Sequence, residues 1–241
     1  MEYTTGAAGD SRQAYVRVID HIKQEIRLGH LALGSRLPAE RALAEQLNVS
    51  RNSVREALHI LEVMGITVST QGAGHFISGN FESSLVETMS IMFLLKKLTF
   101  EQVSQLRYAL EKQAFVLAME KATQEDLDEL QAINTRMEQD TSEEENVLLD
   151  QQLHYTLARI ADNLLIMEIL HALSDVMRRF IADLRRDIMA DENRREMLTA
   201  CHRRLVECMC SRDLEGGYAA IDEHFSLINT RLTVRTKSGE R

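Results

Sequence analysis

Four side chains in the second half of the sequence are of types that bind divalent metal ions. Asp150 and His154 are four residues apart, so a helix would place them on the same face. His202 and His224 follow, each among apolar neighbours with helical spacing. One carboxylate and three imidazoles suit Zn²⁺, Ni²⁺ or Mn²⁺, with a further oxygen completing the coordination. Buried histidines are more often hydrogen-bonded core residues, and spacing alone leaves both interpretations open.

Residues 34–65 have the spacing of two short helices joined by a tight turn. Leu43 and Leu47 give the first helix an apolar face, and Ser50 is a good N-cap for the second. The opposite face of the second helix carries Arg51 and Arg55. In a helix-turn-helix, the first residues of the second helix meet base edges and phosphates, so this pattern predicts DNA binding. Two ordinary amphipathic helices with solvated charges are the alternative.

A small hairpin is expected directly after this segment. Ile66, Val68, Phe76 and Ile77 surround a turn at 71–74 that contains two glycines. Glycine lets the backbone approach a ligand closely. The hairpin would form a wing that lies along the minor groove.

Composition excludes some classes of protein and fits others. Among the 241 residues there is no apolar run of about eighteen, so no membrane span is expected. We recognise no signal peptide, and three cysteines indicate a reducing cytoplasm rather than a disulfide framework. Residues 1–78 carry eight basic and eight acidic side chains, so the net charge of −9 belongs entirely to residues 79–241. DNA attraction must therefore come from arginines on one face.

The second part of the chain is expected to be almost entirely helical. The single proline is Pro38, and only four glycines follow residue 78. Thr99 with Gln102, Thr123 with Asp126 and Ser142 with Glu145 mark helix starts. We predict helices near 83–96, 99–120, 124–139, 143–161, 163–188, 191–210 and 213–234. The predicted fold is mainly α, with an N-terminal winged helix-turn-helix and a C-terminal all-α antiparallel helical bundle.

The segment GSRLPAERALAEQLNVSRNSVREALHILEVMG resembles the winged-helix signature of GntR-type bacterial transcription regulators. The resemblance includes LPAER, VSRNSVREAL and the Gly-x-Gly wing, and it covers about the first third of the chain. It implies DNA contacts from both motif helices and the wing, to which we add Arg36 as a phosphate contact. The implied residues are Arg41, Ser50, Arg51, Asn52, Ser53, Arg55, Gln71 and Gly72.

The segments LRYALEKQAFVLAMEKAT and DQQLHYTLARIADN, with two later histidines, resemble the FCD effector domain of the FadR subfamily. In metal-binding members of this group, one Asp and three His hold a divalent ion, and all four positions are matched here: Asp150, His154, His202 and His224. The resemblance also matches Arg107 to an arginine that faces the effector pocket. There its guanidinium group would bind a carboxylate through two parallel hydrogen bonds. A weak surface pair between Arg107 and Glu111 is the alternative.

These observations predict a cytoplasmic homodimeric regulator rather than an enzyme. It would bind palindromic double-stranded operator DNA, and a small carboxylate held near one divalent ion per chain would change its DNA affinity. The alternative is a helical metalloenzyme fused to a DNA-binding domain, but no candidate general base or nucleophile accompanies the ligands. The expected domains are a disordered lead-in at 1–10, the winged helix-turn-helix at 11–78, a linker at 79–82, the effector domain at 83–232 and a flexible tail at 233–241.

Overall fold

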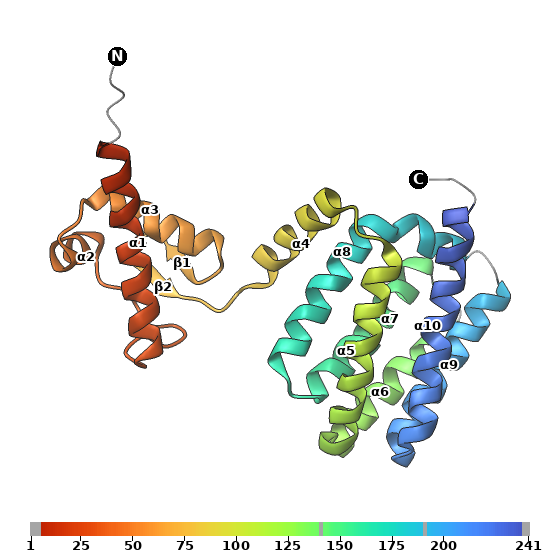
Figure 1. The fold of residues 1–241 in the computed structure, drawn as a ribbon. Coiled ribbons are helices and arrows are strands. Elements are labelled where there is room, and N and C mark those ends of the chain that lie inside the picture. Colours follow the sequence, from red (N-terminus) through yellow and green to blue (C-terminus); the bar gives the residue numbers. More distant parts are fainter. Residues whose placement is uncertain (1–5, 140–141, 190–191, 238–241) are drawn as a thin grey trace. The chain divides into compact units, whose positions relative to one another are not determined.

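The computed structural model describes residues 6–139, 142–189 and 192–237, which form two compact units. The first unit is Met1–Ser84 and the second is Leu85–Arg241. Within the described ranges, ten helices and one two-stranded sheet are present (Figure 1). The predicted fold class, mainly α with a small β wing, is confirmed. No helix among the described residues is both long and apolar enough to span a membrane.

The N-terminal unit is a three-helix core followed by a hairpin. α1 packs against α2 and α3, and the buried side chains between them include Val18, Ile22, Leu43, Val54 and Leu61. The elements are α1 (Gly6–Arg27), α2 (Glu40–Leu47), α3 (Arg51–Val63), β1 (Thr67–Thr70) and β2 (Gly74–Ile77).

The turn between α2 and α3 is fixed by local chemistry. Asn48 takes a left-handed backbone conformation with φ of 49°, which ends α2. The hydroxyl of Ser50 accepts a hydrogen bond from the backbone N–H of Ser53 at 3.0 Å, and this N-cap begins α3 as predicted. Pro38 lies outside the first turn of α2, because Ala39 is the N-cap of that helix.

The wing is an antiparallel hairpin, as the sequence pattern predicted. Thr67 pairs with Ile77, and Thr70 pairs with Gly74. The segment before α2 extends this sheet, because Arg36 bridges to Phe76. The hairpin is therefore tied to the segment that leads into the helix-turn-helix.

Seven further helices follow, and the last six of them form the bundle shown in Figure 1. α5 packs against α7, α8 and α10, while α6 packs against α7 and α9. Full capping boxes begin α5 at Thr99 and α6 at Thr123, and the Ser142 hydroxyl accepts from Glu145 N at the start of α7. The helices are α4 (Glu82–Lys96), α5 (Phe100–Lys121), α6 (Gln124–Met137), α7 (Glu143–Ile160), α8 (Leu164–Met189), α9 (Glu192–Ser211) and α10 (Leu214–Lys237).

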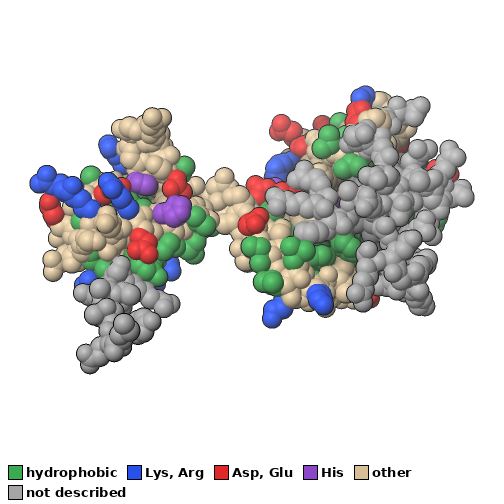
Figure 2. All heavy atoms as spheres, turned by 90° about the horizontal axis from the view of Figure 1, so that it is seen from above, with side chains coloured by type: hydrophobic (Ala, Val, Ile, Leu, Met, Phe, Trp, Pro, Cys, Tyr) green, Lys and Arg blue, Asp and Glu red, His purple; other side chains and the backbone are tan. Residues whose placement is uncertain are grey.

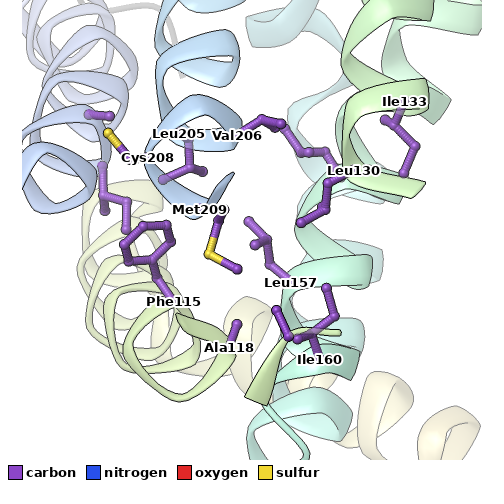
Figure 3. Close-up of a cluster of buried hydrophobic side chains, with 14 of the residues drawn as sticks. Phe115, Ala118, Leu130, Ile133, Leu157, Ile160, Leu205, Val206, Cys208 and Met209 are labelled. Atoms are coloured by element: carbon purple, nitrogen blue, oxygen red, sulfur yellow. The ribbon is translucent and has the colours of Figure 1, made fainter. Parts of the chain in front are cut away.

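The main core of this unit lies among α5, α6, α7, α9 and α10. Phe115, Leu130 and Met209 are fully buried in it, and Figure 3 shows their side chains converging from separate helices. Gly217 allows α10 to approach α5, since a Cβ at that position would lie 2.1 Å from the Phe115 ring. This packing holds α10 beside α5.

The structure differs from the expected terminal segments. Residues 6–10 of the expected lead-in belong to α1, and residues 233–237 of the expected tail belong to α10. Neither stretch contains a proline that would interrupt a helix, and Ala7 and Ala8 favour the helical state. The expected linker at 79–82 overlaps the first residue of α4. Residues 1–5 and 238–241 lie outside the described residues.

Candidate metal centre and DNA-binding face

Three helices of the C-terminal unit contribute the four candidate metal ligands. α7 carries Asp150 and His154 one turn apart, while α9 carries His202 and α10 carries His224. The three histidines are buried and Asp150 is partly buried. The bundle therefore joins residues that are far apart in the sequence into one interior site.

The ligand atoms of these four side chains all lie within 4.8 Å of one another. Nε2 of His202 is 3.2 Å from Oδ1 of Asp150 and 3.2 Å from Nε2 of His224. Ligands about 2.1 Å from a tetrahedral zinc ion lie roughly 3.4 Å apart, so the cluster is close to the spacing that such an ion requires. Nε2 of His154 is buried and has no hydrogen-bond partner among the described residues. Such an orphaned ring nitrogen fits a site built for a cation.

Glu111 is a neighbour of this cluster that the sequence did not reveal. Its Oε2 lies 2.9 Å from Nδ1 of His154, although the two residues belong to α5 and α7. The sequence indicated only that Glu111 follows Arg107 at helical spacing. Its burial and its contact with His154 depend on how the two helices pack.

Arg107 lies in the same interior region and is paired with Glu111. Its Nε and Nη2 donate to Oε1 of Glu111 at 2.9 and 2.6 Å, and Nη1 donates to the sulfur of Met177 at 3.5 Å. The side chains of Arg107 and Glu111 are only 13% and 8% exposed, so the pair differs from the weak surface pair considered above. The guanidinium faces a carboxylate of the protein itself, which is the chemistry that an acidic effector would supply.

The surroundings of these side chains shift their pKa values in different directions. Burial, together with His202 and His154, holds the pKa of His224 well below its usual value. Burial also disfavours a charged His154, but Glu111 outweighs this effect and raises the pKa of His154. For Glu111 itself, burial is outweighed by Arg107 and His154, which lower the pKa of its carboxyl group. At neutral pH Glu111 is therefore ionised and His224 is neutral, the imidazole form that binds metal.

The DNA-binding residues expected from the sequence lie mostly at the surface of the N-terminal unit. Figure 2 shows several Lys and Arg side chains close together on the visible face of this unit, with Asp and Glu side chains among them. Arg51, Asn52 and Arg55 occupy the exposed face of α3, opposite its buried stripe. The exposed residues of the expected set also include Arg36, Arg41, Ser50, Gln71 and Gly72.

Ser53 is placed differently from the other expected contacts. Its side chain is buried, and its hydroxyl lies 2.9 Å from that of Ser50. The hydroxyl is therefore engaged within the turn and does not lie on the outer face of α3. Sequence spacing could not separate Ser53 from its exposed neighbours, because the start of a helix presents successive residues on all sides.

Two of the exposed arginines are held by acidic residues of α2. Arg41 pairs with Glu45 one turn later at 2.8 Å. Arg55 of α3 pairs with Glu40 at 2.7 Å. No ion pair joins Arg51 to any described residue. The exposed face of α2 and α3 thus carries two guanidinium groups held by carboxylates, at Arg41 and Arg55. It carries a third at Arg51 that forms no ion pair with a described residue.

Two family models match the chain, and together they include both candidate sites. The model of bacterial regulatory proteins of the gntR family matches residues 14–77, which contain the helix-turn-helix and the wing. The FCD domain model matches residues 102–227, more than half of the chain, and includes all four clustered ligands. The chain belongs to the GntR family. It is a transcription regulator with an FCD domain.

Similar proteins support this assignment along most of the sequence. A protein of Escherichia coli strain K12 assigned as a regulator of the L-lactate dehydrogenase operon is 27% identical over 221 residues, or 89% of this chain and 84% of that protein. LutR, an HTH-type transcriptional regulator of Bacillus subtilis, is 30% identical over 162 residues, or 67% of this chain and 74% of LutR. These relatives are regulators and not enzymes, so the metalloenzyme alternative is not supported.

A solved structure shows the same fold. The GntR protein of Streptococcus agalactiae aligns with a TM-score of 0.65 at 21% identity, covering 91% of this chain and 99% of that chain.

Proposed function

We propose that this GntR regulator binds double-stranded operator DNA as a homodimer, and that a small carboxylate changes its DNA affinity. The carboxylate would bind beside one divalent metal ion per chain, held by Asp150, His154, His202 and His224. Zinc suits the three imidazoles and one carboxylate best, and nickel or manganese are the alternatives. The observation that carries the proposal is the convergence of these four donors inside the FCD domain.

DNA binding is proposed for the exposed face of α3 and the wing. Arg51 and Arg55 would read base edges, since arginine can pair bidentately with guanine. Other residues of this face would contact the DNA backbone and position the protein on it: Arg36, Arg41, Ser50, Asn52, Gln71 and Gly72. Ser53 would support Ser50 from inside the turn. Either Arg51→Ala or Arg55→Ala should cost about 1–3 kcal/mol of specific binding if the side chain reads a base.

A homodimer is proposed, and its operator would be palindromic because a two-fold dimer imposes two-fold symmetry on its DNA site. Exposed apolar side chains on α4 provide a surface that a second copy would cover: Leu94 is 62% exposed and Leu95 is 77% exposed. Light scattering of the parent and of Leu95→Asp tests this. A parent that stays monomeric at its DNA-binding concentration would contradict the dimer.

The effector class follows from Arg107 and the metal ligands. One oxygen of a carboxylate would approach the ion, while Arg107 would hold another part of the acid. The Escherichia coli relative is assigned to the L-lactate dehydrogenase operon, which makes L-lactate the first acid to test. Arg107→Lys keeps a cation beside Glu111 but removes the guanidinium fork, so it should weaken effector binding about tenfold or more.

The decisive experiment is a linked titration. An operator is first selected from random DNA with the purified protein. DNA affinity is then measured with and without L-lactate and other small carboxylates, before and after removal of metal by a chelator. For a coupling of ~1–3 kcal/mol, the effective acid should change DNA affinity roughly 5- to 150-fold, and DNA should change acid affinity by the same factor. Equal DNA affinities under all of these conditions would refute effector control.

A further inference from the structure

Glu111 is a buried carboxylate that divides its two oxygens between different partners. Oε1 accepts hydrogen bonds from Nε and Nη2 of Arg107 at 2.9 and 2.6 Å. Oε2 lies 2.9 Å from Nδ1 of His154. The carboxylate therefore links the arginine on α5 to a candidate metal ligand on α7.

These contacts determine which ring nitrogen of His154 carries the proton. An ionised carboxylate only accepts hydrogen bonds, so Nδ1 of a neutral His154 must donate its hydrogen to Glu111. Nε2 is then left with the lone pair of the ring. This nitrogen lies 3.8 Å from Oδ1 of Asp150, on the side of the other candidate ligands.

We infer that Glu111 is a positioning residue that holds His154 in the Nδ1–H tautomer and orients its Nε2 lone pair toward a bound metal ion. The inference rests on the proposed metal site and adds a residue that does not itself bind the ion. Carboxylates that accept the second N–H of a metal-binding histidine commonly act in this way, and their loss typically costs about 10- to 100-fold in metal affinity.

Glutamine at position 111 distinguishes this role from simple packing. Glu111→Gln keeps the shape of the side chain but turns one acceptor into a donor. If its oxygen faces Arg107, its NH₂ group faces Nδ1 of His154. His154 must then accept at Nδ1 and carry its proton on Nε2, where the metal would bind. In the opposite orientation the NH₂ group would face the N–H donors of Arg107, and two donors cannot form a hydrogen bond with each other.

The first measurement follows the tautomer of His154 in metal-free protein. Long-range ¹⁵N–¹H spectra of protein with labelled histidine separate the two neutral tautomers at an alkaline pH of about 9. His154→Asn identifies the signal by its absence. The parent should show the Nδ1–H form and Glu111→Gln the Nε2–H form. Glu120→Gln is the matched control, because Glu120 is an exposed carboxylate on the same helix, and its spectrum should equal that of the parent.

The second measurement is zinc affinity, taken by competition with a chromogenic chelator. Glu111→Gln should bind Zn²⁺ about 10- to 100-fold more weakly than the parent. Glu120→Gln should match the parent within about twofold, since no contact with the cluster is lost. Circular dichroism of each metal-free variant establishes that its helices are formed.

The possible outcomes separate this inference from the proposed function. An Nε2–H tautomer in the metal-free parent would overturn the inference, even if Glu111→Gln failed to fold. An unchanged tautomer in folded Glu111→Gln would overturn it as well, whatever the zinc affinity. If the tautomer changes as expected but the parent binds no zinc or other divalent ion, Glu111 still orients His154 and the proposed metal function falls.

Discussion

Arg55 of α3 donates a hydrogen bond from Nε to Oε2 of Glu40 at 2.7 Å, across the turn of the helix-turn-helix. The bond engages Nε of the guanidinium group, and no hydrogen bond joins its Nη atoms to any described residue. A carboxylate on the first motif helix thus orients an arginine on the second.

Glu40→Gln should lower the preference of the protein for operator over random DNA. Loss of the charged acceptor frees Arg55 to adopt more conformations, while loss of a negative charge strengthens binding to every DNA sequence. Exposed ion pairs contribute about 0–1 kcal/mol, so the ratio of specific to random affinity should fall by up to about fivefold. Fluorescence anisotropy with both DNAs measures this ratio.

The control for that variant is Glu56→Gln, which removes the same charge from an exposed position on α3. It should raise both DNA affinities together and leave their ratio unchanged. If Glu40→Gln behaves in the same way, Glu40 contributes only its charge and does not orient Arg55.

A second prediction concerns Gly65, which ends α3. Its φ of +74° is unfavourable for other residues, and a Cβ there would lie 2.1 Å from the carbonyl oxygen of Asn80. Gly29 has a similar φ of +78° but no atom within 4 Å of such a Cβ. In both Gly→Ala variants the free energy of unfolding should fall by about 1–2 kcal/mol, because alanine is disfavoured in the left-handed backbone conformation. The loss should be clearly larger for Gly65→Ala. Equal thermal unfolding temperatures for the two variants would show that the Asn80 contact relaxes without cost.

The sequence predicted the features that depend on neighbours along the chain. Ser50 caps α3 and Thr99 begins α5, because each signal acts within one turn of its own helix. Asp150 and His154 could be paired for the same reason, since they are one turn apart. Capping residues and the scarcity of proline and glycine similarly predicted the helix bounds after residue 78 to within three residues.

Contacts between helices were beyond such reasoning. His202 and His224 were added through residue type and family resemblance, and only the packing of α7, α9 and α10 brings them beside Asp150. The burial of Glu111 and its bond to His154 arise from the packing of α5 against α7, so helical spacing suggested only a surface pair with Arg107.

A third prediction concerns stability in acid. Oδ2 of Asp126 accepts from the backbone N–H and the hydroxyl of Thr123, and Oδ1 accepts from Arg159. The hydrogen bonds from Thr123 lower the pKa of Asp126, with Arg159 adding to the effect. Because the pKa in the folded state is depressed, the stabilisation is present above the unfolded value of about 3.9 and is lost as pH falls through the folded value.

Asp126→Asn should therefore be less stable than the parent at neutral pH, by about 1 kcal/mol for a partly exposed charged cap. The difference should shrink progressively below about pH 4, when the parent carboxylate also becomes neutral. Urea unfolding at a series of pH values measures both curves. A difference that stays constant down to about pH 2 would show that the charge of Asp126 does not matter.

The last prediction concerns removal of the metal. An ion that binds only the folded protein stabilises it by RT ln(1 + [L]/Kd), which is about 4 kcal/mol when the free ion is at a thousand times Kd. Chelation should therefore lower the unfolding temperature of the C-terminal unit, and added Zn²⁺ should restore it. His202→Ala should abolish this zinc-dependent increment, because His202 contacts both Asp150 and His224. His59→Ala is the control, since His59 is an exposed histidine of the N-terminal unit and its loss should leave the increment intact. Calorimetry with elemental analysis of the same samples provides the test. An unfolding temperature that changes with neither chelator nor zinc, in protein shown to contain no bound metal, would refute a stabilising metal site at the four converging side chains.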